Sequence, residues 1–416
     1  MLTPTLSETP RHERPGTNSR TTEGDVTGAL QGTKVLEIGS YVTGPYCGML
    51  LGDLGADVVK VENPQYGDPF RGWGQTALNP TFCSLNRNKR SLTLNLKNPE
   101  AKEVFLKLAD TADVIIENLR AGASDGLGIG YETVRARNPN IVYCSISGFG
   151  SDGPYTDLPA YDTIGQAMGG LLSLLTDLDD PKPMGISLAD HLTGIFACYG
   201  VLAALNARHV TGEGQHVETS LLQSVVSFVQ ENAAGYFDSK RVPSRSTRPR
   251  GPQVHCFVAS DGKPFVIHLS SPEKFWVGLT EAIGQPELQE DPRFTDRALR
   301  TQNYDDLHDI LVEATSKAPR DQWISKLREH DVPCSALNTI PEVFEDPQVK
   351  ALGMAIDLER PGATPVRVSG NPVKLSGTPP TYDLRPPLLG EHNEEVLRSI
   401  GYDADGIERL SKSAAI

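Results

Sequence analysis

Residues 33–62 read TKVLEIGSYVTGPYCGMLLGDLGADVVKVE and establish the fold class. The apolar run from Lys34 to Ile38 ends at a glycine and predicts a strand. A helical stretch from Tyr46 to Leu54 follows, with Gly55 as its stop signal, and Asp57 to Glu62 forms a second predicted strand. A strand, a helix and a strand in this order make a βαβ unit, which implies a parallel sheet.

The same alternation continues over the first 150 residues. A predicted helix from Pro99 to Asp110 leads to the strand Asp113 to Asn118, and another helix leads to the strand Ile141 to Ile146. Repeated alternation of strands and helices is typical of a doubly wound, Rossmann-like α/β domain.

The remaining chain changes character. It contains an apolar helix from Ile195 to His209, a second helix from Ser220 to Phe237, and a basic, proline-broken stretch from Ser239 to Pro252 that reads as a linker. We therefore expect a disordered tail (1–30), a large α/β domain (31–224), a small α+β domain with linkers (225–335) and a C-terminal return to the large domain (336–416). The small domain is predicted from a hairpin at 255–258 and 264–269, with a turn at Asp261-Gly262, and from helices around 273–283, 303–316 and 321–330; strands over 363–374 and a helix after His392 complete the prediction.

Composition excludes several classes of protein. A net charge of -14 argues against a nucleic-acid binder, and no sequence run approaches the roughly 20 apolar residues of a membrane span. The N-terminus lacks the apolar core of a signal peptide. The six cysteines contain no C-x-x-C pair, and the nine histidines no H-E-x-x-H motif. We expect a cytoplasmic protein with reduced cysteines, no metal and no tightly bound cofactor.

The first βαβ unit does not carry a dinucleotide signature. Gly39, Gly44 and Gly48 do not form G-x-G-x-x-G, which would cradle a pyrophosphate. Glu62 ends the second strand, where an acid can bind a ribose hydroxyl, but it stands alone. The sequence therefore disfavours an NAD-dependent dehydrogenase.

Asp190 is the candidate catalytic residue. It follows a glycine-rich approach that includes Gly165, Gly169 and Gly170, and it precedes the predicted apolar helix. One interpretation is a helix N-cap, because an Asp side chain accepts hydrogen bonds from the first free amides. The other is a nucleophile, because an ionised carboxylate attacks activated acyl groups. The segment by itself leaves both open.

Several blocks, in order over about residues 31–400, resemble the class III CoA-transferase family, which includes formyl-CoA transferase and the CaiB proteins. The ordered set is specific, although each block by itself is weak. The blocks are Val35-Leu36-Glu37 leading to Gly44-Pro45, Leu54 to Glu62, Asn86 to Lys97, Asp113 to Asn118, Pro159 to Asp162, Ser187 to Asp190, Thr211 to Gln215, and Pro387 to His392.

The resemblance implies a mechanism centred on Asp190. In the family, the matching Asp attacks an acyl-CoA thioester and forms a mixed anhydride, and the released CoA thiolate then gives an aspartyl-CoA thioester. An acceptor carboxylate reverses the steps. This chemistry requires exclusion of water and amides that stabilise the oxyanions. Gly251, in the basic stretch, is a candidate for a glycine lid.

The resemblance also implies the residues that bind acyl-CoA. Two cations, Lys97 and Arg120, are suitable phosphate partners, with a solvated side chain as the alternative for each. The sequence departs from the family at Asn63 and Gly126, where many relatives have arginines. The implied CoA contacts are Tyr41, Val42, Thr43, Leu94, Asn95, Lys97, Asn118, Leu119, Arg120 and Ala123.

The family fold also serves α-methylacyl-CoA racemases, which need two acid/base groups. Where racemases have Gly-His-Asp, this chain has Ala160-Tyr161-Asp162. An unperturbed tyrosine is a poor base at pH 7, and His191 should point about 100° away from Asp190 on a helix. We therefore favour a transferase. Tyr161 is expected to line the acyl pocket or to be a core tyrosine, and Asp162 to be a supporting or capping acid.

The resemblance further implies a homodimer of two interlocked rings, because relatives build each active site from both chains. A large domain made from both chain ends, with the small domain inserted through two linkers, permits such a ring. Succinyl-CoA as donor and a dicarboxylic acid as acceptor are the implied substrates. An inactive CoA-binding scaffold is the remaining alternative, and the presence of Asp190 argues against it.

Overall fold

The computed structural model describes residues 28–416, so the predicted tail lies almost entirely outside the described residues. A six-stranded, all-parallel sheet forms the centre of the larger lobe, in the order β3-β2-β1-β4-β5-β6. The predicted parallel α/β sheet is thus confirmed. Strand order reverses between β1 and β4. The strands are β1 (Lys34–Ile38), β2 (Asp57–Glu62), β3 (Lys89–Thr93), β4 (Val114–Glu117), β5 (Val142–Ser147) and β6 (His216–Ser220).

Both faces of the sheet are covered by helices, because side chains alternate along each strand. Leu36 and Val59 point into one apolar core with α3, α5, α18 and α19, whereas Val35 and Val58 point into another with α1 and α8. The helices of this lobe are α1 (Thr43–Asp53), α2 (Pro80–Asn86), α3 (Pro99–Ala109), α4 (Ala123–Leu127), α5 (Tyr131–Arg137), α6 (Asp162–Met168), α7 (Leu171–Leu175), α8 (Leu188–Thr211), α9 (Leu221–Phe228), α10 (Gln230–Ser239), α18 (Asn393–Ser399) and α19 (Ala404–Lys412), with a 3-10 turn, η1 (Pro69–Gly72).

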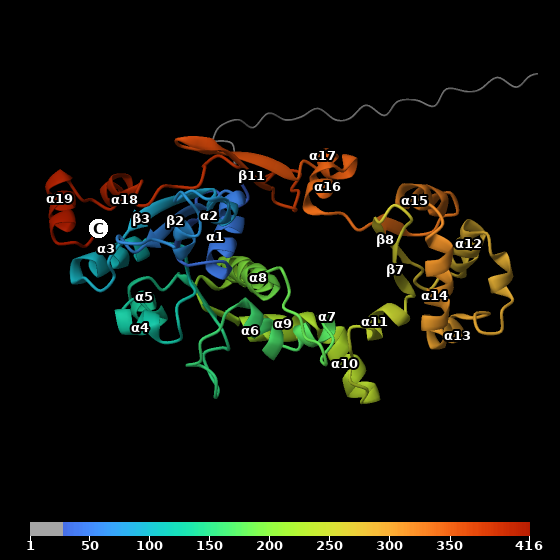
Figure 1. Ribbon diagram of the computed structural model, residues 1–416. Helices are drawn as coiled ribbons and strands as arrows, with labels where there is room; N and C mark the ends of the chain where they lie inside the picture. Colours follow the sequence, from blue (N-terminus) through green and yellow to red (C-terminus); the bar gives the residue numbers. More distant parts are fainter. Residues whose placement is uncertain (1–27) are drawn as a thin grey trace, which may run out of the picture.

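The C-terminal residues return to the larger lobe (Figure 1). Val396 and Leu410, from α18 and α19, are buried in the same core as α3. A hairpin, β10 (Ala355–Arg360) and β11 (Ala363–Ser369), packs on α2 through Leu358 and Val366. This lobe is therefore assembled from both ends of the described chain.

The smaller lobe contains a three-stranded antiparallel sheet, β7-β8-β9, with its own apolar core. Two connections join it to the rest of the chain, one through α11 and one through α16 and α17 (Figure 1). Its elements and connections are α11 (Thr247–Arg250), β7 (Val254–Val258), β8 (Pro264–His268), α12 (Glu273–Ile283), η2 (Pro286–Gln289), α13 (Arg297–Gln302), α14 (Tyr304–Thr315), α15 (Arg320–Glu329), β9 (Cys334–Ala336), α16 (Ile340–Glu345) and α17 (Pro347–Ala351).

Three predictions of local structure were wrong. The apolar helix α8 begins at Leu188, not Ile195, and therefore includes Asp190. The single helix expected from Ser220 to Phe237 is two helices that meet at Val229. Strands β3 and β6 were not predicted, because both carry charged or polar residues that do not form an apolar run.

Helix α8 is long and apolar enough to cross a membrane by length and composition. In the fold it packs as a core helix against α1, α9, β5 and β6. Its Ala197 and Val201 are fully buried, whereas Tyr199 on another face is 69% exposed.

Candidate active site

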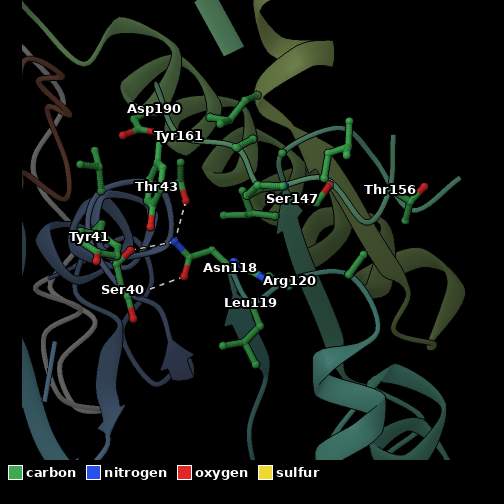
Figure 2. A pocket seen from close by; sticks show the side chains of 18 of the residues that line it. Ser40, Tyr41, Thr43, Asn118, Leu119, Arg120, Ser147, Thr156, Tyr161 and Asp190 are labelled. Atoms are coloured by element: carbon green, nitrogen blue, oxygen red, sulfur yellow. Dashed lines mark hydrogen bonds between the residues drawn. The ribbon is translucent and has the colours of Figure 1, made fainter. Parts of the chain in front are cut away.

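A cavity of about 510 Å³ opens at the carboxyl ends of β1, β4 and β5, where the strand order reverses. Doubly wound sheets bind ligands at this position, because the loops there diverge to opposite faces. Figure 2 shows its side chains converging from loops that are distant in the sequence. The lining comprises Ser40 to Thr43, Asn118 to Ala121, Ile146 to Gly148, Thr156 to Tyr161, Asp190 and Leu221.

Asn118 holds together the two loops on either side of the strand reversal. Its amide oxygen accepts a hydrogen bond from the Ser40 amide (2.9 Å), and its amide nitrogen donates to the Ser40 carbonyl (2.8 Å) and to Thr43 Oγ1 (2.9 Å). These bonds fix the β1–α1 turn, residues 39–42. The turn contains Tyr41 at φ 61, a left-handed conformation that is uncommon for a residue with a side chain.

Asp190 lines the cavity from the first turn of α8, two residues after Leu188. Ser187 occupies the N-cap position, so the N-cap interpretation of Asp190 was wrong. Among residues 28–416, none donates a hydrogen bond to the Asp190 carboxylate or forms an ion pair with it. Its oxygens are therefore free to attack a substrate.

The surroundings of Asp190 disfavour its charge. Burial raises the pKa of this carboxyl to about 7, and the neighbouring Asp162 carboxylate contributes to the increase. Asp162 Oδ1 accepts a hydrogen bond from the Asp190 backbone amide (3.2 Å), while its Oδ2 accepts one from Gln166 (2.6 Å). Asp162 thus helps to fix the backbone of Asp190 through this hydrogen bond.

Glycines in α6 allow the close packing that places Asp162 beside Asp190. A Cβ at Gly165 would lie 2.8 Å from the Leu221 Cβ and 3.3 Å from the Ala189 Cβ, and one at Gly169 would lie 2.3 Å from Val225 Cγ1. These contacts join α6 to α8 and α9. Gly165 in α6 and Gly169 at its C-cap are therefore required by packing, whereas Gly170 is required by its positive φ of 82.

Tyr161 is 65% exposed and points into the cavity from the loop before α6, so the core-tyrosine interpretation was wrong (Figure 2). Its ring contacts the Tyr41 ring edge-on, with centroids 5.9 Å apart. Tyr41 also contacts Phe70 and Trp73. The cavity therefore has an aromatic wall beside the nucleophile candidate.

Leu94, Asn95 and Lys97 line a second cavity, of about 610 Å³, which shares Ser40 and Leu119 with the first. Lys97 is the only lysine or arginine described in the lining of this cavity, and Arg120 is the only one in the first. Both are exposed, and neither forms an ion pair with another described side chain. The two cavities thus lie on either side of Ser40 and Leu119, and each has one available cation in its lining.

Three predicted site residues lie outside these cavities. Ala123 begins α4 and lines neither. Asp162 supports Asp190 without lining the cavity. Gly251 follows α11 in a connection to the smaller lobe, where its carbonyl accepts hydrogen bonds from Arg297 (3.0 and 3.2 Å). Within one chain, nothing brings Gly251 to Asp190.

Sequence reasoning missed the part of the cavity formed after β5. Ser147 and the loop from Thr156 to Ala160 line it, because β5 lies beside β4 and its carboxyl end meets the same edge. The sequence does contain a signal for these residues, because they follow the predicted strand Ile141 to Ile146, and the carboxyl ends of parallel strands lie at one edge of the sheet. His191, in contrast, turns away: its ring contacts Tyr46 and its Nδ1 lies 2.7 Å from the Ser187 carbonyl.

The site consists of a free carboxylate, an aromatic wall and two available cations. Over the described range 28–416, no group of His, Cys, Asp and Glu side chains is arranged to hold a metal ion. The arrangement suits attack by a carboxylate on an activated acyl group that is carried by a long anionic ligand.

Comparisons with known proteins agree on one family. Residues 30–393 match the model of CoA-transferase family III. The chain is 33% identical over 394 residues to succinyl-CoA–D-citramalate CoA-transferase of Chloroflexus aurantiacus, covering 93% of this chain and 98% of that protein. It is 36% identical over 392 residues to succinyl-CoA:mesaconate CoA-transferase of Haloarcula marismortui, covering 90% and 97%.

Solved structures agree with this result. The crystal structure of a CAIB/BAIF family protein from Brucella suis is 34% identical and superposes with a TM-score of 0.80, covering 90% of this chain and 100% of that one. The parallel sheet, the cavity at its carboxyl edge and the sequence matches lead to one conclusion: the chain is an enzyme that belongs to CoA-transferase family III.

Proposed function

We propose that this enzyme moves CoA from succinyl-CoA to a dicarboxylic acid by way of a covalent bond to Asp190. The observation that carries the proposal is the Asp190 carboxylate, which lines the cavity at the strand reversal without a hydrogen-bond or ion-pair partner among the described residues. Relatives are named for succinyl-CoA and for glutarate, mesaconate or citramalate as second substrate, which supports the choice of acids.

The chemistry proceeds in balanced steps. An Asp190 oxygen attacks the thioester carbonyl, the C–S bond breaks, and an aspartyl-succinyl anhydride and CoA thiolate result. The thiolate attacks the aspartyl carbonyl, which releases succinate and leaves an aspartyl-CoA thioester. The acceptor carboxylate then attacks this thioester, which forms an aspartyl-acceptor anhydride and releases the CoA thiolate. The thiolate attacks the acceptor carbonyl of this second anhydride and gives product acyl-CoA and free Asp190. Because the anhydrides hydrolyse readily, the cavity must exclude water while they exist.

The two cavities supply the CoA site. We infer that Lys97 and Arg120 bind phosphate groups, since both are exposed cations without a described partner. Tyr41 and Val42 of the β1–α1 turn, Thr43 at the start of α1, and Asn118 with Leu119 bind the pantetheine arm. Tyr161 contacts the acyl group beside Asp190, and Asp162 positions the nucleophile.

We further infer a homodimer of interlocked chains in the cytoplasm. The two separate connections to the smaller lobe (Figure 1) give a topology that permits a ring, and the exposed Tyr199 on α8 offers an apolar contact. In such a dimer, Gly251 would approach the partner's cavity as a lid. Cross-linking Cys-substituted copies at Tyr199, followed by denaturing electrophoresis, tests this arrangement.

Trapping the covalent intermediate tests the proposed chemistry. Wild-type enzyme, mixed with succinyl-CoA and then hydroxylamine, should carry a hydroxamate on the peptide that contains Asp190, as seen by mass spectrometry. Asp190→Asn provides the control. Deuterium exchange at the α-carbon of a 2-methylacyl-CoA without an adduct would indicate a racemase instead, and CoA binding without either signal would indicate a scaffold.

A further inference from the structure

Beneath the β1–α1 turn lies a group of four charged side chains, Glu37, Lys60, Asp68 and Lys89, which we call the buried charge network. All four are at most 2% exposed. Lys60 Nζ lies 2.8 Å from Glu37 Oε1 and 3.0 Å from Asp68 Oδ2, and Lys89 Nζ lies 2.6 Å from Glu37 Oε2. Two positive and two negative charges therefore balance inside the lobe.

The network holds both ends of the turn through backbone carbonyls. Lys60 Nζ donates to the Gly39 carbonyl (2.7 Å), where β1 ends, and Lys89 Nζ donates to the Pro45 carbonyl (2.7 Å), in the first turn of α1. Asp68 Oδ1 accepts from the Phe70 amide (2.9 Å) and, at 3.4 Å, from the amide of Tyr41, the residue with positive φ. Lys60, Lys89 and Asp68 thus hold three different points of the chain between Gly39 and Pro45, and Glu37 holds the two lysines in place.

The backbone is built around this network. A Cβ on Gly48 of α1 would lie only 2.3 Å from Glu37 Oε2, and one on Gly39 would lie 3.1 Å from Glu37 Oε1. Burial lowers the pKa of the Lys89 ammonium to about 8, and Glu37 opposes this effect. Lys89 therefore depends on Glu37 to remain charged.

Stability is a weak explanation for such a group. Removing charges from water costs several kcal/mol per ion, and well-packed apolar residues of similar volume often stabilise a fold as well or better. The directional bonds to two carbonyls provide what apolar residues cannot, which is a fixed backbone conformation. This matters most where the backbone itself lines a site.

We propose that the buried charge network positions the β1–α1 turn for CoA binding, with Lys89 and Glu37 as positioning residues that do not touch the ligand. The proposal rests on the proposed function only for the identity of the ligand. It assigns a role to the Val-Leu-Glu, Val-Lys-Val-Glu and Asn-Lys-Arg segments, which the proposed chemistry does not use.

Lys89→Met removes the bond to Pro45 while nearly preserving side-chain volume. We expect the Kd for free CoA, measured by calorimetry, to rise at least about tenfold, since the start of α1 loses a charge-assisted hydrogen bond that fixes its position. Hydrogen exchange of residues 40–46 should become faster, and that of β4 should stay as in wild type. A purely structural role would lower the melting temperature without this localised change.

Arg87→Met is the matched control. Arg87 forms an equally buried pair with Asp53 (2.7 Å) in the same lobe, but it holds the Ser369 carbonyl and lines neither cavity. We expect it to lower the melting temperature and to leave the CoA Kd within about twofold of wild type. Equal loss of CoA binding in both variants would overturn the proposal, as would wild-type binding and exchange in Lys89→Met.

A charge-balanced variant, Glu37→Gln with Lys89→Met, covers the case in which Lys89→Met does not fold. It removes one charge of each sign but still leaves the Pro45 carbonyl without its donor. The weaker CoA binding should therefore persist in this variant. Recovery of wild-type CoA binding overturns the proposal. If wild type yields no Asp190 adduct, the proposed chemistry fails, while CoA binding still tests positioning. If wild type does not bind CoA, the proposal is overturned.

Discussion

Two carboxylates of the larger lobe have opposite environments. Glu37, beneath the β1–α1 turn, is fully buried and contacts two lysines at 2.6 and 2.8 Å. Asp190, above the same sheet edge, has no described hydrogen-bond donor or cation at its oxygens. Glu37 is held in one position by two lysines, whereas Asp190 keeps free oxygens and a pKa raised to about 7. The fold thus places a fixed, paired carboxylate and an unpaired, reactive carboxylate on the same lobe.

The same edge of the sheet carries buried paired charges, which fix the backbone, and an unpaired carboxylate, which can react. Paired buried charges satisfy each other, so they can fix a backbone segment without reacting. An unpaired carboxylate in a desolvated cavity is less stable when ionised and is therefore a better nucleophile once substrate arrives. Substitutions that disturb the pairing of Glu37 or the unpaired state of Asp190 should therefore have distinct effects on stability and on activity.

The largest effect is expected from Asp190→Asn. An amide cannot form the anhydride, so transfer from succinyl-CoA should fall by at least about a thousandfold, while CoA binding stays near wild type. Rates and CoA affinity measured on the same preparation check this. Transfer at a wild-type rate by the folded variant would refute the covalent mechanism.

The same variant separates reactivity from stability. The raised folded pKa of Asp190 means that the stability contributed by its protonated form is present below about pH 4 and is lost as pH rises through 7. Asparagine does not titrate. Melting temperatures measured from pH 5 to 8 should therefore favour Asp190→Asn increasingly as pH rises. A constant difference between the two proteins would contradict the raised pKa.

A smaller effect is expected from Gly48→Ala, which disturbs the ion pair between Glu37 and Lys89. The added methyl group would lie 2.3 Å from Glu37 Oε2, which must move away from Lys89. Overpacking of this kind costs about 1–3 kcal/mol, and CoA binding should weaken with it. Gly235→Ala is the control, because nothing lies within 4 Å of a Cβ there. Chemical denaturation distinguishes the two, and equal stability would show that Glu37 is not confined.

Arg120→Met tests the available cation of the cavity. We expect the KM for acyl-CoA to rise about tenfold with kcat little changed, because a phosphate contact acts in both ground and transition states. The dependence of KM on salt should weaken. Arg398→Met, which removes an exposed charge from α18, should change neither value. A fall in kcat alone would place Arg120 at the reacting atoms instead.

The smallest effect is expected from Asp162→Asn. Asparagine can still accept the hydrogen bond from the Asp190 amide, but it removes the negative charge that helps raise the pKa of Asp190. Because the ionised carboxylate is the nucleophile, the acidic limb of the pH–rate profile should shift down by up to about one unit. The rate at pH 6 should thus increase relative to that at pH 8. An unchanged profile would show that burial by itself sets the pKa.

Local sequence patterns determined the centre of the fold. The alternation of short apolar strands with helices predicted the parallel sheet, because strands buried on both faces must be apolar. Strand β3 was not predicted because its Lys89 is neutralised by a carboxylate from β1, a pairing that cannot be read along the chain. Strand β6 was not predicted because its sequence, HVETS, forms no apolar run. Helix α8 began earlier than expected because its first turn carries the polar residues Asp190 and His191, which interrupt the apolar pattern.

The sequence by itself offered Asp190 as an N-cap or a nucleophile, and its resemblance to the class III CoA-transferase family implied the nucleophile and the CoA contacts in the loops after β1 and β4. Only the tertiary structure decided that Asp190 is not an N-cap, that Tyr161 lines the cavity, and that Lys60 and Lys89 lie inside the protein. Burial and pairing are properties of residues brought together from distant segments. The charge state and freedom of a side chain therefore follow from packing, which no local pattern specifies.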